Sequence, residues 1–192
     1  VRLTGGEPTI RGDFARILEG LGEISAASPA PLELGLTTNG VRLKKFLPHL
    51  RAAGLRGINL SVDTLAAAKF PLLARRPLDW HARVMEAMRD VMAQEDHFRL
   101  KLNCVLLRGV NEDEIGGFVN LTEQHPVEVR FLEFMPFTRN GWSANRLVPQ
   151  AEIVSAVKRH LERSGRGELD GCPPTAWTTW RGCGRRACAR LR

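Results

Sequence analysis

Glycine, acidic and polar residues follow apparent strands at several points of this sequence, and their types are those that bind ligands. The first such stretch is Gly5-Gly6-Glu7-Pro8, which follows the strand-like residues 1–4. Glycine has no Cβ, so a ligand can approach the backbone N–H and C=O groups of this loop closely. Pro8 lacks an N–H and ends the strand. By itself the stretch is as typical of a tight turn as of a ligand-binding loop.

Polar side chains recur where four later strand-like runs end. A polar group inside a buried strand costs free energy unless it has a partner. Because the carboxyl ends of parallel strands meet at one edge, such residues gathered there predict a ligand-binding mouth. The polar strand ends are Thr37-Thr38-Asn39, Ser61 with Asp63, Lys101 with Asn103, and the run from Arg130 to Met135.

These residues meet at one edge of a sheet only if strands and helices alternate along the chain. Asp13 and Asn111 are predicted to cap helices, and Gly54 to end one. Five strands separated by helices, at a spacing of roughly 25–35 residues, favour a parallel α/β sheet or barrel. The expected strands cover residues 1–4, 32–36, 55–62, 98–107 and 127–135, and the expected helices cover 14–28, 41–53, 65–73, 79–92, 112–124 and 149–162.

Composition is that of an ordinary globular domain, with 192 residues, 43% hydrophobic and 26% charged. No apolar run approaches the length that spans a bilayer. The chain begins without Met inside an apparent strand, so we expect a fragment whose true N-terminus lies upstream. Four cysteines without a disulfide framework suit a reducing compartment, and Cys104 in an apolar run is expected to be a buried thiol.

The last part of the chain differs from the rest. We expect a core over residues 1–165 and an irregular basic tail over residues 166–192, where glycine and proline are frequent and no helical or strand period is seen. The net charge is +7, and five arginines fall within the last twelve residues. A solvated tail is favoured over a nucleic-acid contact, because the body of the chain has no basic stripe.

Six motifs in order resemble the core of the molybdenum cofactor biosynthesis protein A family, the radical S-adenosylmethionine (SAM) enzymes known as GTP 3′,8-cyclases. The resemblance runs from Val1 to about Leu161, and Met135-Pro136-Phe137 is similar to the eukaryotic branch. The motifs are Arg2-Leu3-Thr4-Gly5-Gly6-Glu7-Pro8, Leu36-Thr37-Thr38-Asn39-Gly40, Ile58-Asn59-Leu60-Ser61-Val62-Asp63-Thr64, Lys101-Leu102-Asn103-Cys104-Val105, Arg108-Gly109-Val110-Asn111-Glu112-Asp113-Glu114 and the run from Val129 to Phe137.

The resemblance implies a partial parallel (β/α)6 barrel of the TIM-like radical SAM type, with about five of its strands present here. It implies the first step of molybdenum cofactor biosynthesis. In that step SAM gives a radical that abstracts a ribose hydrogen from GTP, and the product is (8S)-3′,8-cyclo-7,8-dihydroguanosine 5′-triphosphate, the precursor of cyclic pyranopterin monophosphate. The implied partners are GTP, the next protein of the pathway and a second copy of the chain as a homodimer, with no membrane. The implied compartment is the mitochondrial matrix in a eukaryote and otherwise the cytoplasm.

The same resemblance implies roles for six residues, all at strand ends. Asp63 and Glu133 are also candidate catalytic carboxylates, but a structural hydrogen bond is favoured for both, so no catalytic residue is assigned. The implied SAM-binding residues are Gly6, Ser61 and Met135, and the implied GTP-binding residues are Arg2, Thr37 and Lys101.

Two departures concern the [4Fe–4S] clusters that the resemblance implies for a full-length member. The Cys-x₃-Cys-x₂-Cys loop of the first cluster is expected upstream of Val1. Cys183 and Cys188 match the second-cluster segment only loosely, since four residues separate them, and the ending also suits a mispredicted terminus. We therefore assign no metal ligand and expect this chain to be inactive alone. The alternatives are another radical SAM enzyme and a non-catalytic fragment.

Overall fold

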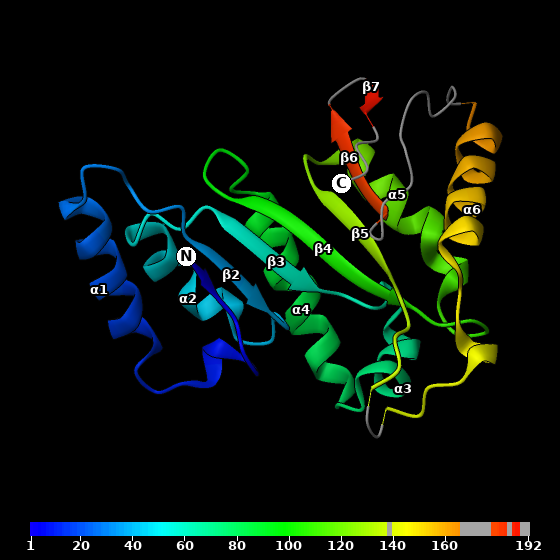
Figure 1. The fold of residues 1–192 in the computed structure, drawn as a ribbon, viewed down its shortest axis with the longest axis horizontal. Coiled ribbons are helices and arrows are strands. Elements are labelled where there is room, and N and C mark those ends of the chain that lie inside the picture. Colours follow the sequence, from blue (N-terminus) through cyan, green and yellow to red (C-terminus); the bar gives the residue numbers. More distant parts are fainter. Residues whose placement is uncertain (138–139, 166–177, 184–185, 189–192) are drawn as a thin grey trace. The chain divides into compact units, whose positions relative to one another are not determined.

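The chain divides into two compact units in this computed structural model, which describes residues 1–137, 140–165, 178–183 and 186–188. Unit 1 comprises Val1–Val62 and Pro77–Lys101, and unit 2 comprises Asp63–Arg76 and Leu102–Arg192. The strands follow one another from β1 to β7 in a seven-stranded sheet, in which β1 to β5 are parallel (Figure 1). The expected parallel α/β class is confirmed.

Unit 1 holds the first three strands, the start of the fourth and three long helices. Its helices form a series in which α1 packs on α2 and α2 on α4. The elements are β1 (Arg2–Leu3), η1 (Pro8–Ile10), α1 (Phe14–Ala27), β2 (Gly35–Thr38), α2 (Leu43–Ala52), β3 (Gly57–Ser61), α4 (Leu78–Met92) and β4 (Arg99–Leu106), of which residues 99–101 belong here.

Leucine and isoleucine at alternate strand positions form the core of unit 1. Leu36, Ile58 and Leu60 are fully buried, and the register places Leu36 beside Ile58. Side chains alternate between the two faces of a strand. The intervening positions therefore lie on the opposite face of the sheet.

The helix ends of unit 1 agree in part with the sequence predictions. Gly54 has φ +73° and follows α2, and the N–H of Leu55 donates back to the carbonyl of Leu50 at 2.9 Å, so the predicted helix stop is confirmed. Asp13 lies at the N-cap of α1 but makes no cap hydrogen bond. The prediction of its capping role was wrong, because the carboxylate forms a bidentate pair with Arg11, at 2.9 Å for each bond.

Unit 2 holds the segment Asp63–Arg76, the rest of β4 and the elements that follow β4. Phe118 of α5 meets Phe131 of β5 edge to face with ring centroids 5.9 Å apart, and both rings are buried. The elements are η2 (Ala67–Lys69), α3 (Phe70–Ala74), η3 (Glu112–Glu114), α5 (Ile115–Gln124), β5 (Glu128–Glu133), η4 (Ala144–Arg146), α6 (Gln150–Arg163), β6 (Thr178–Cys183) and β7 (Arg186–Cys188).

Strands β6 and β7 lie in the segment expected to be irregular. β6 pairs antiparallel with β5, Glu128 standing opposite Arg181, and β7 pairs antiparallel with β6. The expectation of no strand was wrong for these nine residues. Thr178-Thr179-Trp180 has high strand propensity, and the edge of β5 supplies the hydrogen-bonding partner that a short strand needs. The boundary at residue 165 stays a prediction.

Among the described residues, no helix is both long enough and apolar enough to cross a bilayer.

Candidate functional site

The glycine loop after β1 leaves its backbone open. Gly5 has φ +136°, a conformation that residues with a Cβ rarely adopt. A Cβ added to Gly5 or Gly6 would meet no atom within 4 Å, and Gly6 is exposed. The N–H and C=O groups of this loop, which belongs to unit 1, are therefore accessible to a ligand.

Glu7 holds this loop against the end of β2. Its Oε1 accepts from the N–H of Thr9 at 3.1 Å, from the hydroxyl of Thr9 at 2.6 Å and from the hydroxyl of Thr38 at 2.7 Å. Its Oε2 accepts from the N–H of Asn39 at 2.7 Å. Two of the four bonds join the loop to the end of β2, 31 and 32 residues away, so Glu7 is a positioning residue that sequence reasoning missed. The available signal was an acid facing a threonine-rich strand end.

One face of the unit 1 sheet gathers the three residues that the resemblance assigned to GTP. Arg2 pairs with Gly35, and a Cβ added to Gly35 would lie 3.4 Å from Nη1 of Arg2, so the guanidinium lies over that glycine. Thr37 lies two residues further along the same face. The N–H of Arg99 donates to the carbonyl of Arg56 at 2.7 Å, and this bond sets β4 beside β3. Lys101 lies two residues after Arg99 on the same side of β4, so its side chain shares the face.

Asn59 lies at the centre of this face, next to Thr37 in the register. Only 8% of the residue is exposed, and its Oδ1 has no hydrogen-bond partner in the part of the chain that the structure describes. Ser61, predicted to bind SAM, lies two residues on at the exposed end of β3. Sequence reasoning did not assign Asn59, although an amide between Ile58 and Leu60 was a visible signal.

Met135 belongs to unit 2, unlike the other five predicted site residues. It follows β5, and 44% of it is exposed. Its carbonyl accepts from Nδ2 of Asn140 at 2.8 Å, and Nε1 of Trp142 donates to the carbonyl of Phe134 at 2.9 Å. These bonds order the segment after β5 and leave the Met135 side chain accessible.

The two candidate carboxylates both make structural hydrogen bonds. Asp63 accepts from the N–H of Val105 at 2.9 Å, and burial raises the pKa of Asp63 while this hydrogen bond opposes the rise. Glu133 accepts from the N–H of Gln150 at 2.6 Å, at the first residue of α6, where a negative charge is favourable. The preference for structural roles is therefore supported by the geometry of both residues.

Asn111 joins the ends of two strands in unit 2. It is fully buried, and its Nδ2 donates to the carbonyls of Asp63 at 2.7 Å and of Val105 at 2.9 Å. Its Oδ1 accepts from the N–H of Leu107 at 2.7 Å. The predicted helix-capping role of Asn111 was wrong, because strand ends take up both ends of its amide.

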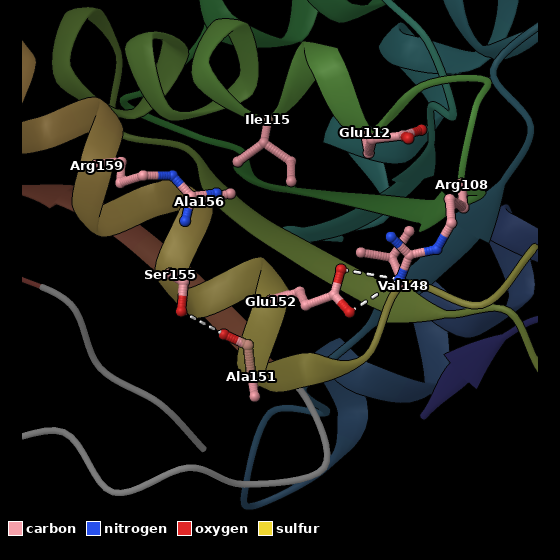
Figure 2. A pocket seen from close by; sticks show the side chains of 9 residues that line it. All are labelled: Arg108, Glu112, Ile115, Val148, Ala151, Glu152, Ser155, Ala156 and Arg159. Atoms are coloured by element: carbon pink, nitrogen blue, oxygen red, sulfur yellow. Dashed lines mark hydrogen bonds and ion pairs between the residues drawn. The ribbon is translucent and has the colours of Figure 1, made fainter.

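A pocket of about 440 Å³ in unit 2 contains none of the predicted site residues (Figure 2). At one end Arg108 donates to both carboxylate oxygens of Glu152 at 2.9 and 2.8 Å. Ile115 and Val148 supply apolar surface, and Arg159 lies at the other end. Cations and carboxylates balance in this lining, so the pocket offers no concentrated charge for a phosphate.

Unit 1 combines an open glycine loop, a cationic and polar sheet face, and parallel strands joined by helices. Residues 1–122 match the radical SAM superfamily. The chain belongs to the radical SAM superfamily. It is similar in fold to a solved structure of TYW1 with a lysine-pyruvate adduct bound, with a TM-score of 0.68 at 16% identity, covering 100% of this chain and 59% of that one.

Two relatives show to which family within the superfamily this radical SAM protein belongs. It is 45% identical over 161 residues to the mitochondrial GTP 3′,8-cyclase of Arabidopsis thaliana, covering 84% of this chain and 40% of that protein. It is 42% identical over 159 residues to molybdenum cofactor biosynthesis protein 1 of Bos taurus, covering 83% and 24%. The predicted kinship to the molybdenum cofactor biosynthesis protein A family is confirmed, and the chain spans less than half the length of these two relatives.

The residues of this radical SAM protein suit SAM better than they suit a cluster. The open Gly5-Gly6 loop presents backbone oxygens that can accept from an ammonium group, and Ser61 adds an exposed hydroxyl in the same unit. A [4Fe–4S] cluster requires thiolate ligands. Among the described residues, no three His, Cys, Asp or Glu side chains form a metal-binding group.

Of the four cysteines, Cys104 is the one whose side-chain surroundings are described. Cys104 is fully buried, as predicted, and burial raises the pKa of its thiol well above the usual range, with the nearby carboxylates of Asp63 and Glu114 adding to the effect. A buried neutral thiol is a poor metal ligand. Cys183 ends β6 and Cys188 ends β7, while Cys172 lies outside the described residues.

Proposed function

We propose that the chain is part of a GTP 3′,8-cyclase, a lyase that uses SAM to cyclise GTP to (8S)-3′,8-cyclo-7,8-dihydroguanosine 5′-triphosphate in the first step of molybdenum cofactor biosynthesis. The observation that carries the proposal is the sheet face of unit 1, where Arg2, Thr37 and Lys101 come together. This face occurs in a chain 45% identical to a GTP 3′,8-cyclase.

The face has the chemistry that a nucleoside triphosphate requires. Arg2 presents a planar guanidinium that can bind phosphate oxygens in pairs, and Lys101 adds a mobile point charge. Thr37 contributes a hydroxyl that donates and accepts. Strands β1, β2 and β4 carry these groups on one face of the unit 1 sheet, and we expect them to act on one ligand together.

The cofactor would be held by the loop after β1 and by the end of β3. The carbonyl of Gly6 would accept from the methionyl ammonium of SAM, and the hydroxyl of Ser61 would bind its ribose or carboxylate. Met135 would contribute apolar contact to the adenine. When bound, SAM supplies the radical chemistry, and the residues of this chain bind and orient the two ligands.

The remaining parts of the proposal come from the family. The [4Fe–4S] clusters would be ligated by cysteines that include a Cys-x₃-Cys-x₂-Cys loop, a pattern that this sequence lacks. The product would pass to the pyranopterin-forming protein of the next step. The compartment would be the mitochondrial matrix in a eukaryotic host, as the name of the Arabidopsis relative suggests, or the cytoplasm in a bacterium. A homodimer is the proposed assembly.

Calorimetric titration of the purified chain with GTP, ATP and SAM tests the proposal. We expect GTP and SAM to bind, and Lys101→Met to weaken GTP binding by about tenfold or more, because a charge-assisted contact is lost. The matched control is Lys44→Met, which removes an exposed lysine of α2 paired with Glu86 and should leave GTP binding unchanged. Binding of SAM without GTP would indicate another radical SAM enzyme, and binding of neither would indicate a non-catalytic fragment.

Turnover requires the cluster. The chain is fused to an N-terminal segment carrying the Cys-x₃-Cys-x₂-Cys loop of a relative, and iron and sulfide are reconstituted under anaerobic conditions. We expect GTP consumption together with release of 5′-deoxyadenosine. Reconstituted protein that binds both ligands and releases no 5′-deoxyadenosine would overturn the proposed reaction.

A further inference from the structure

Asn59 is a buried polar residue on the sheet face of unit 1 that also carries Thr37 and Ser61. It lies in the middle of a parallel strand between Ile58 and Leu60, which are fully buried. It is itself more than nine-tenths buried, and its Oδ1 has no hydrogen-bond partner among the described residues. Nearly all buried amide groups in folded proteins have partners. The missing partner of Asn59 points to a group that comes from outside the described part of the chain.

The residues next to Asn59 indicate which site the missing hydrogen-bond partner belongs to. Thr37 pairs with Asn59 in the β2–β3 register, and Lys101 lies on the other side through the pairing of β4 with β3. Ser61 lies two residues further along the same face. Asn59 is thus enclosed by residues of the proposed GTP and SAM sites, and it has no role in either site as assigned so far.

We propose that Asn59 is a further substrate-binding residue whose side-chain amide hydrogen-bonds the nucleoside part of the nucleoside triphosphate. The inference rests on the proposed function and extends it. An orphaned acceptor requires a donor, and phosphate oxygens of GTP are acceptors. Ribose hydroxyls and the guanine N–H groups are the donors of GTP, so Asn59 contacts the nucleoside while Arg2 and Lys101 contact the phosphates.

The buried position of the amide is consistent with this role. Arg2 and Lys101 have long side chains on the same face, where they can bind phosphate oxygens while the amide faces the nucleoside. Recognition by a buried amide is also selective, because a ligand lacking the matching donor leaves the amide unpaired. Asn59 would therefore contribute specificity as well as affinity.

Stability separates this role from a structural one. Asn59→Leu replaces the amide by an apolar side chain of similar size, and replacing an unpaired polar group in this way is nearly neutral or stabilising. We expect its melting temperature to equal or exceed that of the wild type. A clear fall in melting temperature would show that the amide supports the fold, and would overturn the inference.

The second measurement compares the affinity of each variant for GTP with its affinity for inorganic tripolyphosphate, which lacks the nucleoside. We expect Asn59→Leu to weaken GTP about tenfold and to leave tripolyphosphate unchanged, whereas Lys101→Met weakens both. Asn59→Asp keeps the acceptor and should retain more GTP affinity than Asn59→Leu. Unchanged GTP binding in Asn59→Leu, or equal weakening of GTP and tripolyphosphate, would overturn the inference.

Two analogues locate the donor within the nucleoside. If the effect of Asn59→Leu disappears with 2′-deoxy-GTP, the donor is the ribose hydroxyl, and if it disappears with inosine triphosphate, the donor is the 2-amino group. An effect that persists with both assigns the remaining N–H or hydroxyl donors. A wild-type chain that does not bind GTP would overturn the proposed function and this inference together, whereas GTP binding that depends on Lys101 alone would overturn only the inference.

Discussion

The carboxylate of Glu7 accepts a hydrogen bond of 2.7 Å from the hydroxyl of Thr38, although 31 residues separate them in the chain. Thr38 is buried, and its oxygen also accepts from the N–H of Gly40 at 3.1 Å. The glycine loop after β1 and the turn after β2 are therefore held by one pair of side chains. Both segments border the proposed ligand-binding face.

Glu7→Gln should loosen this connection. Glutamine offers one acceptor oxygen, so its NH₂ group must face a donor such as the N–H of Asn39. We expect the free energy of unfolding to fall by about 1–3 kcal/mol, and SAM binding to weaken because the Gly6 loop is less restrained. Urea unfolding and calorimetric titration measure the two effects. Glu19→Gln, at an exposed position of α1, is the control, and equal behaviour of the two variants would contradict the prediction.

Gly40→Ala should destabilise unit 1 more than Gly54→Ala. Both glycines have positive φ, +81° and +73°, so both variants carry backbone strain of about 1–2 kcal/mol. Only at Gly40 would the new Cβ meet a side chain, 2.5 Å from Cδ1 of the buried Leu60, and overpacking adds about 1–3 kcal/mol. Thermal unfolding of both variants isolates the packing contribution. Equal losses of stability would show that the core yields at Leu60.

Asp63→Asn should change how stability depends on pH. The folded state raises the pKa of Asp63 through burial, so folding opposes its ionisation. The favourable contribution of the neutral carboxyl is complete below the ordinary pKa of about 4 and is lost as pH rises through the folded pKa. Asparagine does not ionise, and its oxygen can still accept from the N–H of Val105. We expect the variant to gain stability relative to the wild type as pH rises.

The measurement for this prediction is urea unfolding at a series of pH values. Asp96→Asn removes the same charge from an exposed residue paired with Arg51, and it corrects for the change in net charge. A stability difference for Asp63→Asn that stays flat or declines with rising pH would contradict the assigned environment.

Cys104 should resist alkylation in the folded chain. The thiolate is the reactive form, and burial raises the pKa of this thiol well above its usual range. We expect iodoacetamide to leave the peptide that contains Cys104 unmodified in native buffer and to modify it in urea, as read by mass spectrometry. Equal labelling in the two conditions would show that the strand opens readily.

Several features of the site were predictable from the sequence because they depend on neighbouring residues. The strand pattern of Ile58 to Ser61 has a period of two, which places Ile58 and Leu60 on one face and Asn59 and Ser61 on the other. The sequential order of parallel strands then brings polar groups to one edge. Thr37 and Lys101 could therefore be placed at one edge before the fold was known, and the family resemblance added Arg2.

Other features depend on partners that are distant in sequence, and local sequence patterns do not predict such partners. Asp13 and Asn111 have the residue type of helix caps, but Arg11 and the strand ends at Asp63 and Val105 compete successfully for their side chains. The strand pairing of residues 178–183 likewise depends on the free edge of β5.

The sequence by itself determined the class of fold, the family and the set of polar strand ends, since periodicity and motif order are local properties of the chain. Only the tertiary structure decided which of those polar groups are already satisfied. Glu7, Asp63 and Glu133 have their hydrogen bonds within the protein, whereas the amide oxygen of Asn59 has none among the described residues. That difference arises from three-dimensional packing, which sets the distance between groups far apart in the chain.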